Sequence, residues 1–267
     1  MSEQLRVKPG RKIALPDHDP GDTPGFRHTS AVDRILEENA VRLSELQYLL
    51  YAENKRALLI VLQAMDTGGK DGTIRHVMSR LNPSGCRVKS FKVPTEEELE
   101  HDFLWRVHQA VPPRGKFGIF NRSHYEDVIV VRVHGLKSRS VWEARYDQIN
   151  AFERHLVENE VTILKFFLHI SKEEQKKRIQ ERIKDPTKRW KLAPSDFEER
   201  KYWDEYQRAY EDALNRCSTK WAPWFIIPAD KKWFRNLAVS QIMVEALESM
   251  RMKFPKPTFD PSKLKLV

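Results

Sequence analysis

The sequence lacks long apolar runs and is poor in cysteine. No stretch approaches the roughly 20 apolar residues that a helix needs to span a bilayer, and the first residues carry no apolar segment like that of a secretory signal. The only two cysteines, Cys86 and Cys217, are too few for a disulfide framework. We therefore expect a cytoplasmic protein without a membrane partner, in which both thiols serve packing.

Nucleic-acid-binding patterns are also missing, although the chain is strongly basic. Its 267 residues carry a formal net charge of +9, which favours an anionic partner such as nucleic acid, membrane phosphate or a phosphorylated metabolite. No zinc-finger spacing, RNA-recognition signature or basic zipper is present. We therefore expect a phosphate-rich partner other than nucleic acid.

Short apolar runs alternate with helical patterns, which indicates one large α/β domain. Residues 1–30 are expected to form an extended N-terminal arm, and residues 31–267 a single catalytic domain. The patterns predict strands over 57–63, 87–91, 117–120, 161–170 and 224–227, and helices over 31–53, 73–81, 95–110, 141–159, 172–184, 195–216 and 234–252. This order predicts a parallel sheet covered on both faces, with ligands bound beyond the carboxyl ends of its strands.

The most informative stretch is a glycine-rich loop between the first predicted strand and a helix (residues 64–73, the phosphate loop). Its glycines allow close approach of the backbone to phosphate oxygens, while helix-start amides and Lys70 face the anion. Asp66 adds a carboxylate suited to Mg²⁺. The predicted phosphate-binding residues are Thr67, Gly68, Gly69, Lys70, Asp71, Gly72 and Thr73.

This loop departs from the standard Walker A pattern. Ala64 stands in place of the first glycine, and Asp71 in place of the serine or threonine that binds magnesium. The alternative is an ordinary strand-to-helix turn with a lysine in solvent. We favour phosphoryl transfer, because the run GGKDG requires so much backbone freedom.

A second cluster, residues 121–127, follows the third predicted strand. The planar fork of Arg122 could bridge donor and acceptor phosphates. Asn121, Glu126 and Asp127 could orient the attacking phosphate or hold magnesium, directly or through water. The alternative is a helix cap, in which Asn121 or Ser123 caps and Glu126 completes a capping box with Ser123.

A third cluster is basic and resembles a lid. Residues 172–191 contain nine basic and four acidic side chains. Arg178 and Arg182 share a helix face, since they are four residues apart, and Asp185-Pro186 is expected to end the helix before a loop with Lys188 and Arg189. Residues 172–201 (the lid segment) could close on phosphates and exclude water; the alternative is a solvated helix face.

The motifs together resemble the polyphosphate kinase 2 family. The matching segments, in the family's order, are AMDTGGKDGT, NPSG, FNRSHYEDV and DPTKRWKL, and the resemblance covers about residues 43–252. It implies a P-loop kinase-like three-layer α/β sandwich with a helical lid, and Mg²⁺-dependent phosphate transfer between inorganic polyphosphate and nucleotides. It also implies roles for Asp66 as the metal and phosphate carboxylate, Lys70 as the P-loop lysine, Arg122 as the Walker-B-region arginine, and Arg178 and Arg182 as lid arginines.

One departure from the family pattern concerns Asn121, because many relatives carry aspartate there. With Glu126 nearby, it resembles the branch that phosphorylates both nucleoside mono- and diphosphates, and Glu126 or Asp127 would supply the missing carboxylate. The resemblance thus predicts reversible conversion of AMP to ADP and of ADP to ATP, by a homo-oligomer (dimer or tetramer). Alternatives are an NTP-dependent nucleotide kinase and a non-catalytic polyanion-binding protein. The predicted catalytic residues are Asp66, Lys70, Arg122, Glu126, Arg178 and Arg182, and the predicted nucleotide-binding residues are Asn121, Arg122, Ser123 and Glu126.

Overall fold

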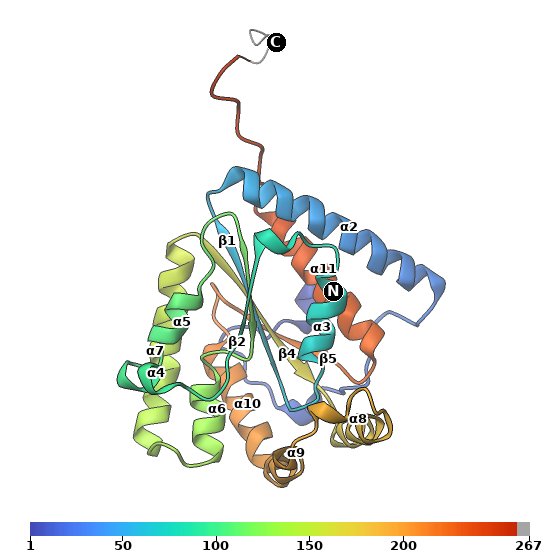
Figure 1. The fold of residues 1–267 in the computed structure, drawn as a ribbon, viewed down its shortest axis with the longest axis vertical. Coiled ribbons are helices and arrows are strands. Elements are labelled where there is room, and N and C mark those ends of the chain that lie inside the picture. Colours follow the sequence, from blue (N-terminus) through green and yellow to red (C-terminus); the bar gives the residue numbers. More distant parts are fainter. Residues whose placement is uncertain (261–267) are drawn as a thin grey trace.

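Five parallel strands form the centre of the molecule (Figure 1). The computed structural model describes residues 1–260, with residues 195 and 196 described by their backbone alone. The strands are β1 (Ala57–Ala64), β2 (Cys86–Ser90), β3 (Phe117–Asn121), β4 (Val161–His169) and β5 (Trp224–Pro228), in the order β2-β3-β1-β4-β5. Each lies within one residue of its predicted bounds, so the predicted five-stranded parallel sheet is confirmed.

Helices cover both faces of the sheet, as predicted (Figure 1). One face carries α2 (Ser30–Glu53), α3 (Lys70–Val77) and α11 (Lys232–Ser249), and the other carries α6 (Glu126–Val133), α7 (Arg139–Glu158) and α10 (Trp203–Cys217). Shorter helices are α1 (Ser2–Leu5), α4 (Glu96–Glu100), α5 (Trp105–Ala110), α8 (Lys172–Lys184) and α9 (Pro194–Glu199). The result is a three-layer α/β sandwich.

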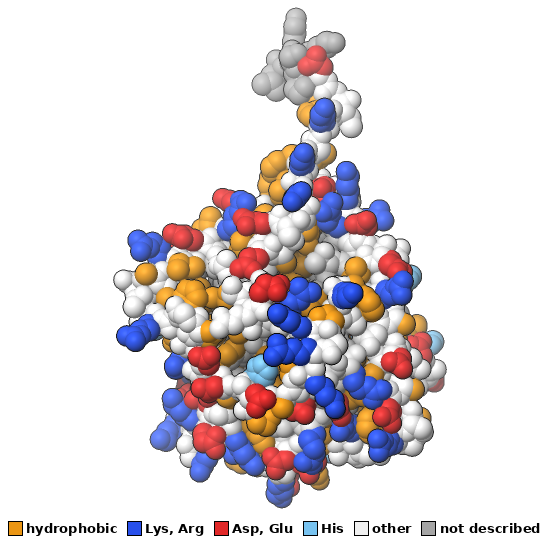
Figure 2. Space-filling model, turned by 180° about the vertical axis from the view of Figure 1, so that it is seen from behind, with side chains coloured by type: hydrophobic (Ala, Val, Ile, Leu, Met, Phe, Trp, Pro, Cys, Tyr) orange, Lys and Arg blue, Asp and Glu red, His pale blue; other side chains and the backbone are white. Residues whose placement is uncertain are grey.

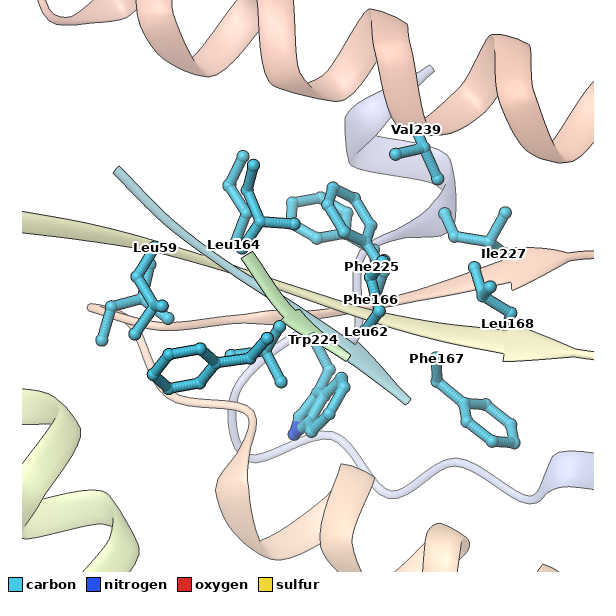
Figure 3. Close-up of a cluster of buried hydrophobic side chains, with 14 of the residues drawn as sticks. Leu59, Leu62, Leu164, Phe166, Phe167, Leu168, Trp224, Phe225, Ile227 and Val239 are labelled. Atoms are coloured by element: carbon cyan, nitrogen blue, oxygen red, sulfur yellow. The ribbon is translucent and has the colours of Figure 1, made fainter. Parts of the chain in front are cut away.

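The core lies on both sides of the central strands (Figure 3). Successive side chains of a strand point to opposite faces. Phe166 therefore packs beside Phe225 on the side of α11, whereas Phe167 contacts Tyr210 of α10. All eight positions of β1 are buried, so its sequence does not alternate between apolar and polar residues and is apolar at every position except Gln63.

The N-terminal arm packs against the outer edge of β5. Arg6 forms an antiparallel bridge with Phe225, and the Val7 amide donates to the Trp224 carbonyl at 2.9 Å. Leu5 and Leu15 are buried in the core. The arm thus covers a strand edge that would otherwise present unpaired backbone groups.

Two expected helices are divided, and two further helices, α1 and α6, lie outside the predicted set. Residues 95–110 form α4 and α5, because Asp102 Oδ1 accepts the Leu104 amide at 2.9 Å and this local bond competes with the helix. Residues 195–216 form α9, a 3₁₀ turn (Arg200–Tyr202) and α10. Helix α1 lies within the arm that was expected to be extended, and the run of Val and Ile in α6 has low intrinsic helix propensity.

Both cysteines are free, in keeping with a packing role. Cys217 is fully buried, and Cys86 is half-buried with its Sγ 3.1 Å from Gln47 Nε2. Within residues 1–260, no helix is both long enough and apolar enough to cross a bilayer.

The buried imidazole at the end of β4 predicts a loss of stability in acid. His169 is 6% exposed, and burial together with His18 lowers its pKa to about 4. An unfolded histidine binds a proton near pH 6.5, so between these values the unfolded state binds more protons and the folded state loses stability as the pH falls. When the pH is lowered from 7 to 4.5, the unfolding free energy of the wild type should fall. In His169→Gln, which lacks the imidazole, this fall should be smaller by about 2 kcal/mol. Urea unfolding at both pH values measures this difference, and identical pH dependences would contradict it.

Candidate active site

The parallel pairing of β1 with β3 brings the first two predicted clusters together. Leu62 of β1 lies in register with Asn121 of β3, so both strands end at the same edge of the sheet. Asp66 and Lys70 follow the first strand, and Arg122 follows the second. In a parallel sheet this edge is where ligands bind.

The phosphate loop is tightly folded and needs its glycines. A Cβ at Gly68 would lie 2.5 Å from the Ala64 Cβ and 2.8 Å from the Met65 carbonyl oxygen, so alanine does not fit there. Gly69 has φ +104°, and the non-glycine Thr67 has φ +62°. Helix α3 begins directly after this turn, which leaves its first amides directed out of the helix end.

Lys70 lies across the loop that it belongs to. Its Nζ donates to the Ala64 carbonyl at 3.1 Å. Burial lowers the pKa of Lys70, and the nearby Arg122 guanidinium lowers it further, against the opposing effect of Asp66 and Glu126. A partly desolvated cation of this kind interacts strongly with an incoming anion.

Arg122 stands between two carboxylates. Its Nη2 lies 2.8 Å from Asp66 Oδ1, and its Nη1 lies 4.0 Å from Glu126 Oε2. Burial raises the pKa of Glu126, although Arg122 and Lys70 oppose this shift. Arg122 also has φ +62°, a conformation that non-glycine residues rarely adopt and that is concentrated at functional sites.

The capping-box alternative for this segment is wrong. Ser123 Oγ accepts bonds from the Tyr125 amide and from Gln63 Nε2, while the Glu126 amide donates to the backbone carbonyl of Ser123. The α6 helix has no side-chain cap, because the serine is fully buried and turned toward β1.

A buried ionic network holds this segment from below. Lys165 Nζ donates to Tyr125 Oη at 2.8 Å and pairs with Glu153 Oε2 at 2.5 Å, and His124 lies 3.1 Å from the same carboxylate. Burial opposes ionisation of Glu153, but Lys165 and His124 together outweigh it and hold the pKa of that carboxylate below its usual value. A lysine inside an apolar strand was the signal for this network, and sequence reasoning missed it.

The lid arginines occupy different environments. Arg178 is buried; its Nη1 donates to the Thr67 carbonyl at 3.1 Å, its Nη2 to the Ala229 carbonyl at 2.5 Å, and its Nε to Glu174 at 2.8 Å. It therefore braces the backbone of the phosphate loop. Arg182, which is half-buried, has no hydrogen-bond or ion-pair partner within residues 1–260.

The rest of the lid segment contacts the phosphate loop through Gln175, whose Nε2 donates to the Asp66 carbonyl at 2.9 Å, and through one ion pair. Lys188 pairs with Asp185 at 2.5 Å, and Arg189 donates to the Ile183 carbonyl at 2.8 Å, so both are engaged locally and exposed. Asp71 of the phosphate loop accepts Asn121 Nδ2 at 2.7 Å and lies 3.9 Å from Lys191 Nζ. Asp71 thus links loop, strand end and lid.

The donor set fits a magnesium ion shared with substrate phosphates. Among the described residues, no group of three or more His, Cys, Asp or Glu side chains could hold a metal by itself. Mg²⁺ commonly uses one or two protein carboxylates and takes its other ligands from water and phosphate. Asp66, whose side chain is 31% exposed beside the phosphate loop, suits that role.

Surface charge alone does not mark the site. On the face shown in Figure 2, Lys and Arg side chains are interspersed with Asp and Glu and form no uniform basic surface. The positive charges at the phosphate loop come instead from individual residues of several elements, among them Arg235 of α11, which sequence reasoning missed.

Comparison with known proteins identifies the family. The model of the family Polyphosphate kinase 2 matches residues 28–255. An AMP/ADP-polyphosphate phosphotransferase from Meiothermus ruber is 55% identical over 258 residues, which cover 96% of each chain. An ADP-polyphosphate phosphotransferase from Rhodopseudomonas palustris is 46% identical over 269 residues, covering 96% of this chain and 93% of the relative.

A solved structure agrees with these matches. The crystal structure of polyphosphate kinase 2 from Arthrobacter aurescens TC1 is similar at a TM-score of 0.94 and 45% identity, covering 98% of this chain and 93% of that one. The chain belongs to the polyphosphate kinase 2 family and is a phosphotransferase, which confirms the predictions of family, fold class and enzyme class.

Substitution of the two lid arginines should affect stability and turnover differently. Arg178→Met leaves three backbone carbonyls and the Glu174 carboxylate without their buried partner, so we expect a loss of about 3 kcal/mol of unfolding free energy. Arg182→Met, the matched control on the same helix, should change the unfolding free energy by less than about 0.5 kcal/mol while still reducing turnover. Urea unfolding and initial rates measure the two effects. Equal stabilities of both variants would refute the bracing role of Arg178.

Proposed function

We propose that this enzyme transfers phosphate from inorganic polyphosphate to AMP and ADP, forming ADP and ATP in a reversible, magnesium-dependent reaction. The observation that carries the proposal is the position of Arg122, between Asp66 and Glu126 and beside the phosphate loop. The printed names of the relatives, which act on AMP, ADP and polyphosphate, support it. A cytoplasmic location and a homo-oligomeric state belong to the same proposal.

The reaction is an in-line displacement. An oxygen of the acceptor's terminal phosphate attacks the terminal phosphorus of polyphosphate, the bridging P–O bond breaks, and the shortened chain leaves with the electron pair. Such a transfer depends on positioning and charge neutralisation more than on a strong base. This requirement matches a site in which cations outnumber free carboxylates.

Each residue of the site has a proposed task in this displacement. The α3 amides and Lys70 bind the donor phosphates, and Arg122 spans donor and acceptor. Glu126 orients the acceptor phosphate, and Asp66 would hold Mg²⁺, which neutralises phosphate charge when bound. The lid segment, with Arg182, Lys188 and Arg189, closes over the chain and excludes water.

An assay without nucleoside triphosphate tests the function. Protein, Mg²⁺, polyphosphate and AMP are incubated, and the nucleotides are then separated; the wild type should form ADP and then ATP. Lys70→Ala should slow this by about a hundredfold or more, because the transferring phosphoryl group loses a fixed cation. The matched control is Lys55→Ala, an exposed lysine at the opposite end of β1. Product formation only when an NTP is added would instead identify an NTP-dependent kinase.

Acceptor choice tests the role of Glu126. AMP and ADP place their attacking phosphates at different depths, so Glu126→Gln should lower the ratio of AMP to ADP initial rates by about tenfold, near 1.4 kcal/mol. Since Glu126 caps no helix, the melting temperature should change little. The control is Glu158→Gln on the exposed end of α7. An unchanged ratio with a lowered melting temperature would show that Glu126 is structural only.

A further inference from the structure

Arg235 is a buried arginine that pairs with no carboxylate of the described residues. It lies in the first turns of α11 and is 2% exposed. Its Nε and Nη2 donate to Asn236 Oδ1 at 3.1 and 2.8 Å, and within residues 1–260 its side chain forms no other hydrogen bond and no ion pair. Buried guanidinium groups are normally paired with an anion, so this one requires an explanation.

The guanidinium of Arg235 lies directly against the phosphate loop. A Cβ at Gly69 would lie 2.1 Å from its Nη1, and a Cβ at Gly72 would lie 3.2 Å from its Nη2. Gly72 is inside α3, where glycine is an unfavourable residue. A side chain at position 72 would therefore push the Arg235 guanidinium away from α3 by a few tenths of an ångström.

Arg235 also differs electrostatically from its neighbour Arg178. Both guanidinium groups approach Gly69, but Arg178 is compensated by Glu174 at 2.8 Å. Burial and the charge of Arg178 lower the pKa of Arg235 to about 10, so it remains charged at neutral pH. Its charge therefore adds to the positive end of α3, where an anion is already favoured.

We propose that Arg235 is a polyphosphate-binding residue of the phosphate loop, whose buried guanidinium is neutralised by the inorganic phosphate chain and by no carboxylate of the protein. This inference rests on the proposed function, since the phosphate chain is the donor there. A purely structural Arg235 would instead support the loop without changing its affinity for anions.

Two variants abolish the uncompensated positive charge of Arg235, one by deleting it and one by pairing it with a carboxylate. Arg235→Gln deletes the guanidinium. Asn236→Asp keeps it and places a carboxylate where Asn236 Oδ1 already accepts its bonds, so the charge is compensated without loss of packing. The matched control is Arg56→Gln, a half-buried arginine at the amino end of β1 whose Nη1 donates to the Met250 carbonyl.

Binding is measured by the rise in melting temperature with tripolyphosphate and Mg²⁺, and with ADP as the comparison ligand. We expect tripolyphosphate affinity to fall at least tenfold in Arg235→Gln and at least fivefold in Asn236→Asp, with ADP affinity and the Arg56→Gln variant unchanged. Asn236→Asp should melt no lower than the wild type. Unchanged tripolyphosphate affinity in a folded Asn236→Asp protein, or equal losses for tripolyphosphate and ADP, would overturn the proposal.

Kinetics give a second, independent readout. Both variants should raise KM for polyphosphate while kcat stays within about threefold, and the slope of log KM against log salt should fall by about one, because one fewer counterion is displaced. A lower kcat at unchanged KM would overturn the proposal. If the wild type makes no product from polyphosphate, the proposed function fails, whereas the tripolyphosphate melting curves still decide the role of Arg235.

Discussion

The parallel pairing of β1 with β3 is the constraint on which the site depends. It fixes two strand ends side by side, and each strand end then supplies one half of the chemistry: the phosphate loop from β1, and Arg122 from β3. The pairing is stable because β1 is buried along its whole length between β3 and β4. The charged groups at the edge thus rest on an apolar centre that does not depend on them.

Around that edge, the cationic side chains of Arg178 and Lys70 donate hydrogen bonds to backbone carbonyls. Arg178 donates to three carbonyl oxygens, of Thr67, Ala229 and Asp230, and Lys70 donates to that of Ala64. A carbonyl satisfies a donor without cancelling its charge. The loop is therefore held firmly while the charge of Lys70 remains available to an incoming anion, whereas the charge of Arg178 is compensated by Glu174 at 2.8 Å. The strained Thr67 and the glycine inside α3 contribute to the same arrangement at a cost in stability.

Local sequence signals predicted the sheet and the chain segments of the site. Apolar runs marked all five strands, and the glycine loop, the segment after β3 and the basic lid were visible as motifs. What they could not predict are contacts between segments far apart in the chain. Arg235 against Gly69 and Lys165 beside Glu153 depend on how helices pack on the sheet. The apolar strand around Lys165 indicates that this lysine is buried but does not identify its partner, and the sequence around Arg235 does not distinguish it from an exposed arginine. The roles assigned to individual site residues remain predictions.

The two departures from the usual motifs, at Asp71 and Asn121, are explained by the contact between these two side chains. Asp71 replaces the metal-binding serine or threonine of the phosphate loop, and Asn121 replaces the aspartate common after the third strand; in the structure the amide of Asn121 donates to Asp71 at 2.7 Å. Aspartates at both positions would bring two carboxylates into contact, which like-charge repulsion disfavours. The amide turns this contact into a hydrogen bond and leaves the other oxygen of Asp71 facing Lys191, 3.9 Å away. An acid at position 71 therefore serves to connect the loop to the lid, and Asp66 is left as the carboxylate of the phosphate loop that pairs with Arg122.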